Sequence, residues 1–223
     1  EPGCIRYELH QSLDDPRILK VHGMSPVPDA RHRGRSSSAQ AIDAAHFFAT
    51  EVWTWRGLVT FYTVFVINLA SRRAHIVGST PHPDEWFMQQ AARTLTAADE
   101  GALIGHRVLI CDWDAKWSAP LRERLGEVGL RVVQTPYQAP NANAYAERFV
   151  RSIKEECLDR VIPLGEHHLR RTIAEYVEHY HHERNHQGLA NELIEGVPAA
   201  DHVGRIHRRP RLGGLLNYYD RAA

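Results

Sequence analysis

The most informative segment of the sequence is VLICDWDAKW, residues 108–117. Its first four residues, Val108–Cys111, are apolar, and a run of this length predicts a buried strand. The strand leads directly into the carboxylate of Asp112, and a second carboxylate, Glu147, lies where a helix is predicted to begin. Two such acids can converge on a hard divalent cation such as Mg²⁺, which prefers oxygen ligands.

The segments on either side predict an α/β protein. Three strands rich in β-branched and aromatic residues precede the segment and predict an antiparallel meander, at Ala45–Trp53, Leu58–Leu69 and Ala74–Ser79. Two further strands, Val108–Cys111 and Leu130–Val133, alternate with helices predicted at 84–95, 120–128, 143–158 and 166–184. The predicted fold is therefore a mixed five-stranded sheet flanked by helices.

The helix predicted at 143–158 has two distinct faces. Apolar side chains recur at every fourth position and predict its buried face: Tyr145, Phe149, Ile153 and Cys157. Glu147, Arg151 and Lys154 share a separate polar face, at i, i+4 and i+7. That spacing usually indicates an exposed face with salt bridges, and only the acid upstream at Asp112 favours a functional interpretation.

Composition sets limits on the organisation of the chain. Its 223 residues are enough for one substantial core, which we place at residues 41–195. Residues 1–40 are predicted to be an irregular segment or linker, with a short helix near Ile5–Leu13, and residues 196–223 a basic tail. Lys plus Arg and Asp plus Glu both number 27, so the net charge does not indicate a polyanionic partner, although local basic patches can still supply one.

The cellular setting follows from two further observations. The three cysteines are sparse and odd in number, which indicates a reducing compartment rather than a disulfide framework. No apolar run approaches the roughly 18 residues of a membrane-spanning helix. The expected location is the cytoplasm.

Three motifs resemble those in the catalytic core of retroviral-type integrases and insertion-sequence (DDE-type) transposases. The second-acid segment of that family is similar to DWDAKW at 112–117, and the third-acid segment to PNANAYAERFVRSIKEE at 140–156. The closing motif of the family core resembles YHHERNHQGL at 180–189. The resemblance covers residues 41–195 and implies a ribonuclease-H-like fold.

The resemblance also implies an activity on DNA. Members of this family, which are encoded by mobile elements, carry out DNA integration and recombination by strand transfer, as homo-oligomers on DNA. By analogy Asp112 and Glu147 would be catalytic residues and ligands of Mg²⁺ or Mn²⁺, with two ions in a complete site. Lys154 corresponds to a DNA-contacting lysine, and Arg148 and Arg151 are further candidates for nucleic acid binding.

Position 46 departs from the family pattern. The family carries its first acid on the first strand, before a run similar to EVWT, whereas this chain has HFFATEVWT at 46–54 with His46 in place of the acid. A neutral imidazole offers one nitrogen and suits Zn²⁺ or Mn²⁺ better than Mg²⁺. Asp43 lies three residues away, on the opposite face of a regular strand, and could substitute only through a bulge. Two hypotheses follow: impaired strand transfer with His46 as a weak third catalytic residue, or a catalytically inactive DNA-binding remnant of a transposase.

A third hypothesis comes from HERNH at residues 182–186. Two histidines at i and i+4 on a helix, with a glutamate beside the first, are typical of zinc metalloproteases. In this chain Gln187-Gly188 follows directly, so the motif falls where the helix is expected to end. A cluster of surface histidines is the alternative explanation.

Overall fold

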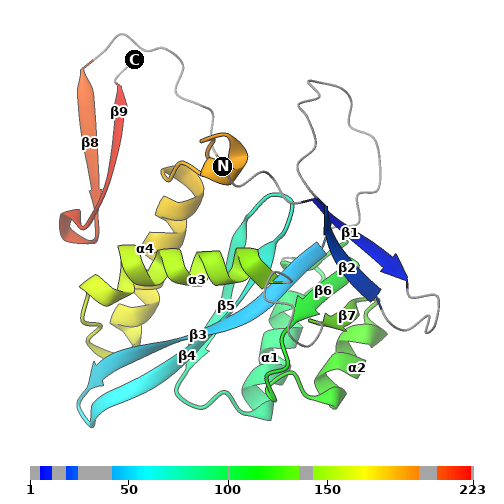
Figure 1. The fold of residues 1–223 in the computed structure, drawn as a ribbon. Coiled ribbons are helices and arrows are strands. Elements are labelled where there is room, and N and C mark those ends of the chain that lie inside the picture. The colour runs from blue at the N-terminus through cyan, green and yellow to red at the C-terminus, as the bar shows by residue number, and fades with distance from the viewer. Residues whose placement is uncertain are drawn as a thin grey trace.

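The structure is a computed structural model that describes residues 6–11, 19–24, 42–99, 101–135, 143–195 and 205–221. Its helices are α1 (Glu85–Leu95), α2 (Ala119–Glu127), α3 (Ala144–Glu156) and α4 (Gly165–His182), with short 3-10 turns at Leu158–Arg160, Gln187–Leu189 and Leu212–Gly214. Figure 1 shows these elements around one central sheet. Among the helices of these described ranges, none is long and apolar enough to cross a membrane.

The central sheet has five strands in the order β5-β4-β3-β6-β7. The meander of β3 (Ile42–Thr54), β4 (Gly57–Asn68) and β5 (Ala74–Thr80) is antiparallel. In contrast, β6 (Val108–Cys111) is parallel to β3, and β7 (Arg131–Gln134) is parallel to β6. This is the mixed, ribonuclease-H-like sheet that the sequence predicts.

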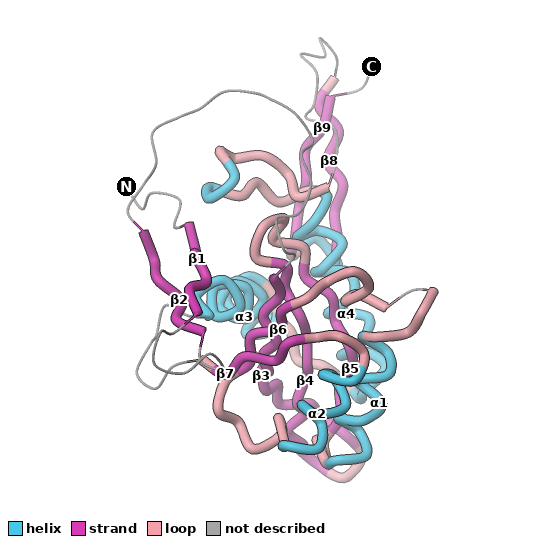
Figure 2. The backbone as a smooth tube through the Cα atoms, turned by 90° about the vertical axis from the view of Figure 1, so that its right-hand side faces the viewer, coloured by secondary structure: helices cyan, strands magenta, loops and turns pink. Residues whose placement is uncertain are grey.

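Alternate side chains of β6 enter two different hydrophobic cores. Val108 and Ile110 pack in the core that also contains α3 and α4, whereas Leu109 and Cys111 pack in the core formed with α1 and α2. Figure 2 shows α3 on one side of the sheet and α1 and α2 on the other. A strand that is buried on both faces needs apolar side chains at every position. Asp112 is therefore the first polar residue beyond the buried stretch.

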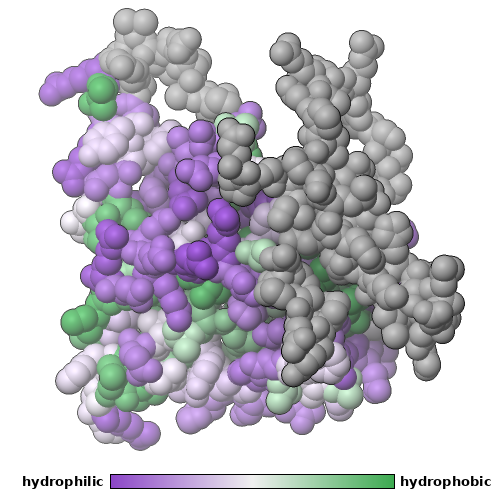
Figure 3. All heavy atoms as spheres, in the orientation of Figure 1, coloured by the Kyte–Doolittle hydropathy of each residue, from purple (hydrophilic) through white to green (hydrophobic). Residues whose placement is uncertain are grey.

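The amphipathic pattern of α3 is confirmed. Phe149, Ile153 and Cys157 are fully buried, while Glu147 and Arg151 are exposed. Hydrophilic residues accordingly dominate the surface over this helix in Figure 3. Packing of one apolar stripe thus fixes which side chains of α3 face solvent.

Two hairpins lie outside the central sheet. The strands β1 (Arg6–Gln11) and β2 (Leu19–Met24) pair in antiparallel fashion, so the helix predicted near Ile5–Leu13 is wrong. Backbone hydrogen bonds to β2, which no local pattern reveals, hold this segment extended. At the other end, β8 (Ile206–Arg211) and β9 (Leu216–Arg221) form a hairpin within the segment predicted as a basic tail.

Candidate active site

The parallel pairing of β3 and β6 sets the geometry of the site. Ala44 lies opposite Ile110, and continuing that register by two residues brings His46 level with Asp112 at the carboxyl end of β6. The His46 Nδ1 atom lies 3.1 Å from Asp112 Oδ2. This is the distance of an ion pair, but the direction is not that of a hydrogen bond, and His46 Nδ1 is buried without an aligned partner.

Asp112 remains ionised although it is partly buried. Burial opposes its charge, but the contact with His46 and the hydrogen bond donated by the backbone N–H of Asp114 to Asp112 Oδ1, at 3.2 Å, outweigh this cost. The pKa of the Asp112 carboxyl therefore lies below its usual value. A carboxylate in this state attracts cations, and His46 already stands against one of its oxygens.

A lysine that sequence reasoning missed lies beside these acids. Lys116 Nζ is 2.5 Å from Asp114 Oδ2, and its backbone N–H donates to Asp114 Oδ1 at 3.0 Å. The ammonium group also lies 4.8 Å from the centre of the Phe47 ring on β3. Asp114 thus stabilises the turn after β6 and is already paired with a cation. The only signal in the sequence is a lysine two residues beyond an acid, which is common in turns.

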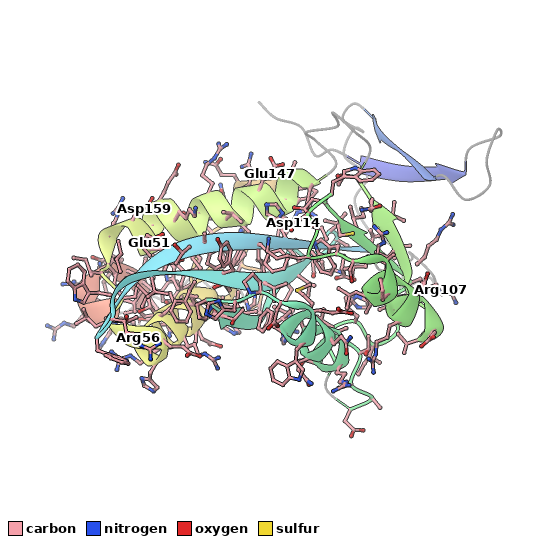
Figure 4. The ribbon with its side chains drawn as sticks, turned by 90° about the horizontal axis from the view of Figure 1, so that it is seen from below. Glu51, Arg56, Arg107, Asp114, Glu147 and Asp159 are labelled. Carbon is pink, nitrogen blue, oxygen red and sulfur yellow. The ribbon has the colours of Figure 1, made fainter. Side chains whose placement is uncertain are left out.

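Glu147 occupies the exposed side of the first turn of α3. Figure 4 shows it on that helix and shows Asp114 in the loop beyond β6. Throughout the described ranges, no three His, Cys, Asp or Glu side chains lie close enough together to hold a metal ion. The structure therefore brings His46 and Asp112 together but does not assemble a three-ligand centre with Glu147.

Asp43 does not replace the missing acid. The pairing of β3 with β4 runs from Asp43 to Thr54 without a register shift, so Asp43 and His46 point to opposite faces of the sheet. Asp43 is buried, accepts a hydrogen bond from Asn68 Nδ2 at 3.2 Å, and contacts His106 Nδ1. Desolvation raises the pKa of the Asp43 carboxyl, despite the opposing effect of His106. Asp43 therefore makes buried contacts near the start of β3, on the face of the sheet opposite to His46.

The predicted DNA-contacting cations all lie on α3. Arg148 and Arg151 are exposed, and Lys154 is partly buried one turn further along. The spacing of three residues places these cations along one side of the helix, near Glu147. The segment that precedes α3, residues 136–142, lies outside the described residues.

The zinc-protease motif lacks the helical geometry that it requires. The helix α4 ends at His182, and Glu183 is its C-cap residue. His182 is exposed, whereas His186 is buried, with its Nε2 atom 2.8 Å from the Tyr180 carbonyl. Glu183 binds Arg211 at 2.8 Å rather than standing free as a base. The two histidines therefore do not share one helical face, and the protease hypothesis has no structural basis.

Comparisons with known proteins agree with the motifs. Residues 129–192, which include α3 and α4, match the family model described as "Integrase core domain". A search of curated proteins found no match. Among solved structures, the chain is similar to the catalytic core domain of BIV integrase, with 11% identity, a TM-score of 0.37, and coverage of 53% of this chain and 69% of that one.

A second solved structure is a chain of the simian T-cell lymphotropic virus intasome in complex with PP2A regulatory subunit B56 gamma. It is 13% identical, with a TM-score of 0.49, and the match covers 86% of this chain and 72% of that chain. The sequence match includes the segments at 140–156 and 180–189, which carry the resemblance to the integrase core. Over residues 129–192 the chain is therefore similar to the integrase core domain, as the motifs predict.

Proposed function

We propose that the protein acts on DNA as a transposase or integrase whose strand-transfer chemistry is impaired by His46. The observation that carries this proposal is the match of residues 129–192 to the integrase core domain, since that segment contains both Glu147 and Lys154. The segment is joined to a ribonuclease-H-like sheet in which Asp112 follows β6. Fold alone does not define activity, so the proposal depends on these side chains.

The residues of this chain would divide the work between positioning and chemistry. Lys154, Arg148 and Arg151 would hold DNA phosphates along α3, because arginine and lysine form charge-assisted hydrogen bonds with phosphate oxygens. Asp112 and Glu147 would supply oxygen ligands for Mg²⁺ or Mn²⁺ once a carboxylate stands at position 46. With His46 in place, an imidazole nitrogen lies 3.1 Å from Asp112 Oδ2.

A catalytically inactive DNA-binding remnant is the second candidate function. It is favoured by the 3.1 Å contact between His46 and Asp112 and by the absence of a three-ligand group in the part of the chain that the structure describes. In this case the basic side of α3 would still bind DNA without turnover. In either case we propose that the protein binds DNA as a homo-oligomer, because a transposase handles two DNA ends together. We also propose that it is associated with the nucleoid of a bacterial cell.

A strand-transfer assay on the His46→Asp variant tests the proposal. We expect the substitution to raise activity with Mg²⁺ and with Mn²⁺, because it replaces one neutral nitrogen with two anionic oxygens. His82→Asp makes the same chemical change at an exposed position and serves as the matched control. If the unmodified chain is fully active with Mg²⁺ and the substitution changes nothing, our account of position 46 is wrong. If the variant binds DNA but stays inactive, the remnant hypothesis is favoured.

A further inference from the structure

We propose that the β8–β9 hairpin is a second DNA-contacting surface, whose exposed arginines bind the phosphate backbone of duplex DNA. The proposal rests on the proposed action on DNA and adds a surface that is separate from α3. Figure 1 shows the hairpin extending beyond the end of α4, away from the central sheet. Its sequence from 205 to 211, RIHRRPR, is the most basic stretch that the structure describes in this part of the chain.

One face of the hairpin is anchored to the body of the protein. Arg211 pairs across the hairpin with Leu216, which is buried in the core that contains α3 and α4. Arg211 Nε donates to Glu183 Oε2 at 2.8 Å, and the backbone N–H of Leu212 donates to Glu175 Oε2 at 3.1 Å. The hairpin is thus a fixed projection, which reduces the entropy lost when it binds a partner.

The opposite face of the hairpin is open to solvent. Because side chains alternate along a strand, the cross-strand pair Arg208 and Tyr219 lies on the other face from Arg211 and Leu216. Ile206 is 58% exposed and Tyr219 is 60% exposed. Arg208 Nε donates to Asn217 Oδ1 at 2.6 Å, which holds the guanidinium in place on this face.

The charge of the hairpin is not cancelled by its own acids. Arg209 pairs with Asp220 at 2.5 Å, and Arg211 pairs with Glu183. Arg205 and Arg208 are exposed and have no carboxylate partner among the described residues. The whole chain has a formal net charge of zero, so this excess of positive charge is local. Arginine suits phosphate because its planar guanidinium offers two parallel donors.

The shape of the hairpin also favours DNA over a protein partner. A two-stranded ribbon is narrow enough to lie along or enter the major groove of a duplex. Adding a strand from a second copy would require a smooth edge with free backbone donors. Pro210 has no backbone N–H, so β8 lacks one hydrogen-bond donor, and the arginines place like charges along the strand. Both features oppose the addition of a strand.

Salt-dependent binding of a labelled duplex of arbitrary sequence, measured by fluorescence anisotropy, tests the surface. Because each lost phosphate contact lowers the slope of log affinity against log salt by about 0.9, Arg205→Gln combined with Arg208→Gln should lower it by about 2. Arg208→Lys should keep the slope of the unmodified chain. The matched control combines Arg93→Gln with Arg124→Gln, two exposed arginines on α1 and α2 across the sheet.

The outcomes separate this proposal from the proposed function. If the unmodified protein binds DNA and the hairpin variant behaves like the α1 and α2 control, the hairpin proposal is overturned and action on DNA still stands. If the unmodified protein does not bind DNA, both are overturned. If the double variant has a lower unfolding temperature, Arg205→Gln alone decides, because that exposed side chain should still account for a slope change of about 1 without disturbing the hairpin.

Discussion

At the scale of single residues, the exchange of a carboxylate for an imidazole at position 46 changes the charge of the whole site. A carboxylate offers two anionic oxygens that can bridge two cations, whereas imidazole offers one nitrogen and itself becomes a cation when protonated. In this chain the imidazole nitrogen lies 3.1 Å from Asp112. Lys116 is already paired with Asp114, so one of the two acids that follow β6 has a cation beside it.

Glu147 can be separated from DNA binding by a substitution that keeps its shape. Glu147→Gln removes the negative charge from an exposed position on α3, so the fold should be unaffected. We expect it to abolish any metal-dependent nicking, because an amide is a poor ligand for Mg²⁺, and to leave DNA affinity nearly unchanged. Nicking of a supercoiled plasmid and anisotropy of a labelled duplex provide the two measurements. Glu155→Gln, an exposed acid on the same helix, is the control, and equal nicking by Glu147→Gln would remove Glu147 from the site.

The proximity of His46 to Asp112 could be predicted from the sequence. The motifs place one residue on the first strand and the other at the end of the fourth, and parallel pairing brings both to one edge of the sheet. The position of Glu147 relative to these two residues could not be predicted in this way. It depends on how the chain enters α3 from the loop after β7, and no periodic pattern fixes the direction of a loop.

At the scale of elements, the apolar stripe of α3 packs between the central sheet and α4. The Phe149 ring lies 4.8 Å from Phe65 on β4 and 5.0 Å from Tyr180 on α4, measured between ring centres. Aromatic side chains bury large areas and favour tilted or edge-to-face contacts of this kind. The same packing turns the charged side of α3 outward.

A buried histidine connects α4 to the sheet. The backbone N–H of Ala74, the first residue of β5, donates to His181 Nε2 at 3.0 Å. The accepting nitrogen must be unprotonated, and His181 is only 6% exposed. Burial accordingly lowers the pKa of His181 from 6.5 to about 4. The contact therefore holds only while the ring is neutral.

The stability of the fold should depend on pH through this histidine. Because the folded-state pKa of His181 is lower than its ordinary value, the unfolded chain binds the proton first, and stability is lost as pH falls from 6.5 towards 4. The loss is at most about 3 kcal/mol, since one unit of pKa corresponds to about 1.4 kcal/mol. Urea unfolding at pH 7 and pH 5 should show a smaller pH effect for His181→Gln than for the unmodified chain. His182→Gln, at an exposed position, should retain the full effect, and equal pH dependence of all three proteins would contradict the assignment.

The elements that the sequence predicts well are those with a strong local pattern. The helix α1 begins where Asp84 was expected to open it, and Asp84 Oδ1 accepts from the backbone N–H of Phe87 at 2.8 Å. The hairpins were missed because their strands carry weak patterns. The strand β8, IHRRPR, contains Pro210 and four charged or ionisable side chains, and it is extended because β9 supplies its hydrogen bonds. Pairing between segments is a tertiary property that local propensity does not report.

At the scale of the whole molecule, the closing motif at 180–189 is a junction between three parts of the fold. Arg184 reaches α3, where its Nε and Nη2 atoms lie 2.7–3.1 Å from the Glu156 carboxylate. Glu183 reaches the C-terminal hairpin through Arg211. His186 contacts the Tyr180 carbonyl and fixes the turn after α4. Glu183, Arg184 and His186 of the HERNH segment therefore hold α3, α4 and the hairpin together.

We predict that loss of the ion pair between Glu183 and Arg211 loosens the β8–β9 hairpin. Glu183 Oε2 accepts from Arg211 Nε at 2.8 Å and lies 2.9 Å from His179 Nδ1, and these contacts hold the pKa of the Glu183 carboxyl below its usual value despite partial burial. Glu183→Gln removes the negative charge with which Arg211 pairs, and hydrogen bonds to charged groups are typically worth about 1.5–3 kcal/mol. Amide hydrogen exchange should become faster in β8 and β9, while the buried strands β3 and β6 keep their protection, because their cores do not include Glu183. Glu178→Gln is the control, since Glu178 is exposed and its distance to His182 is 3.8 Å. Unchanged protection of the hairpin in Glu183→Gln would show that Leu216 and the contact of Leu212 with Glu175 hold it without the ion pair.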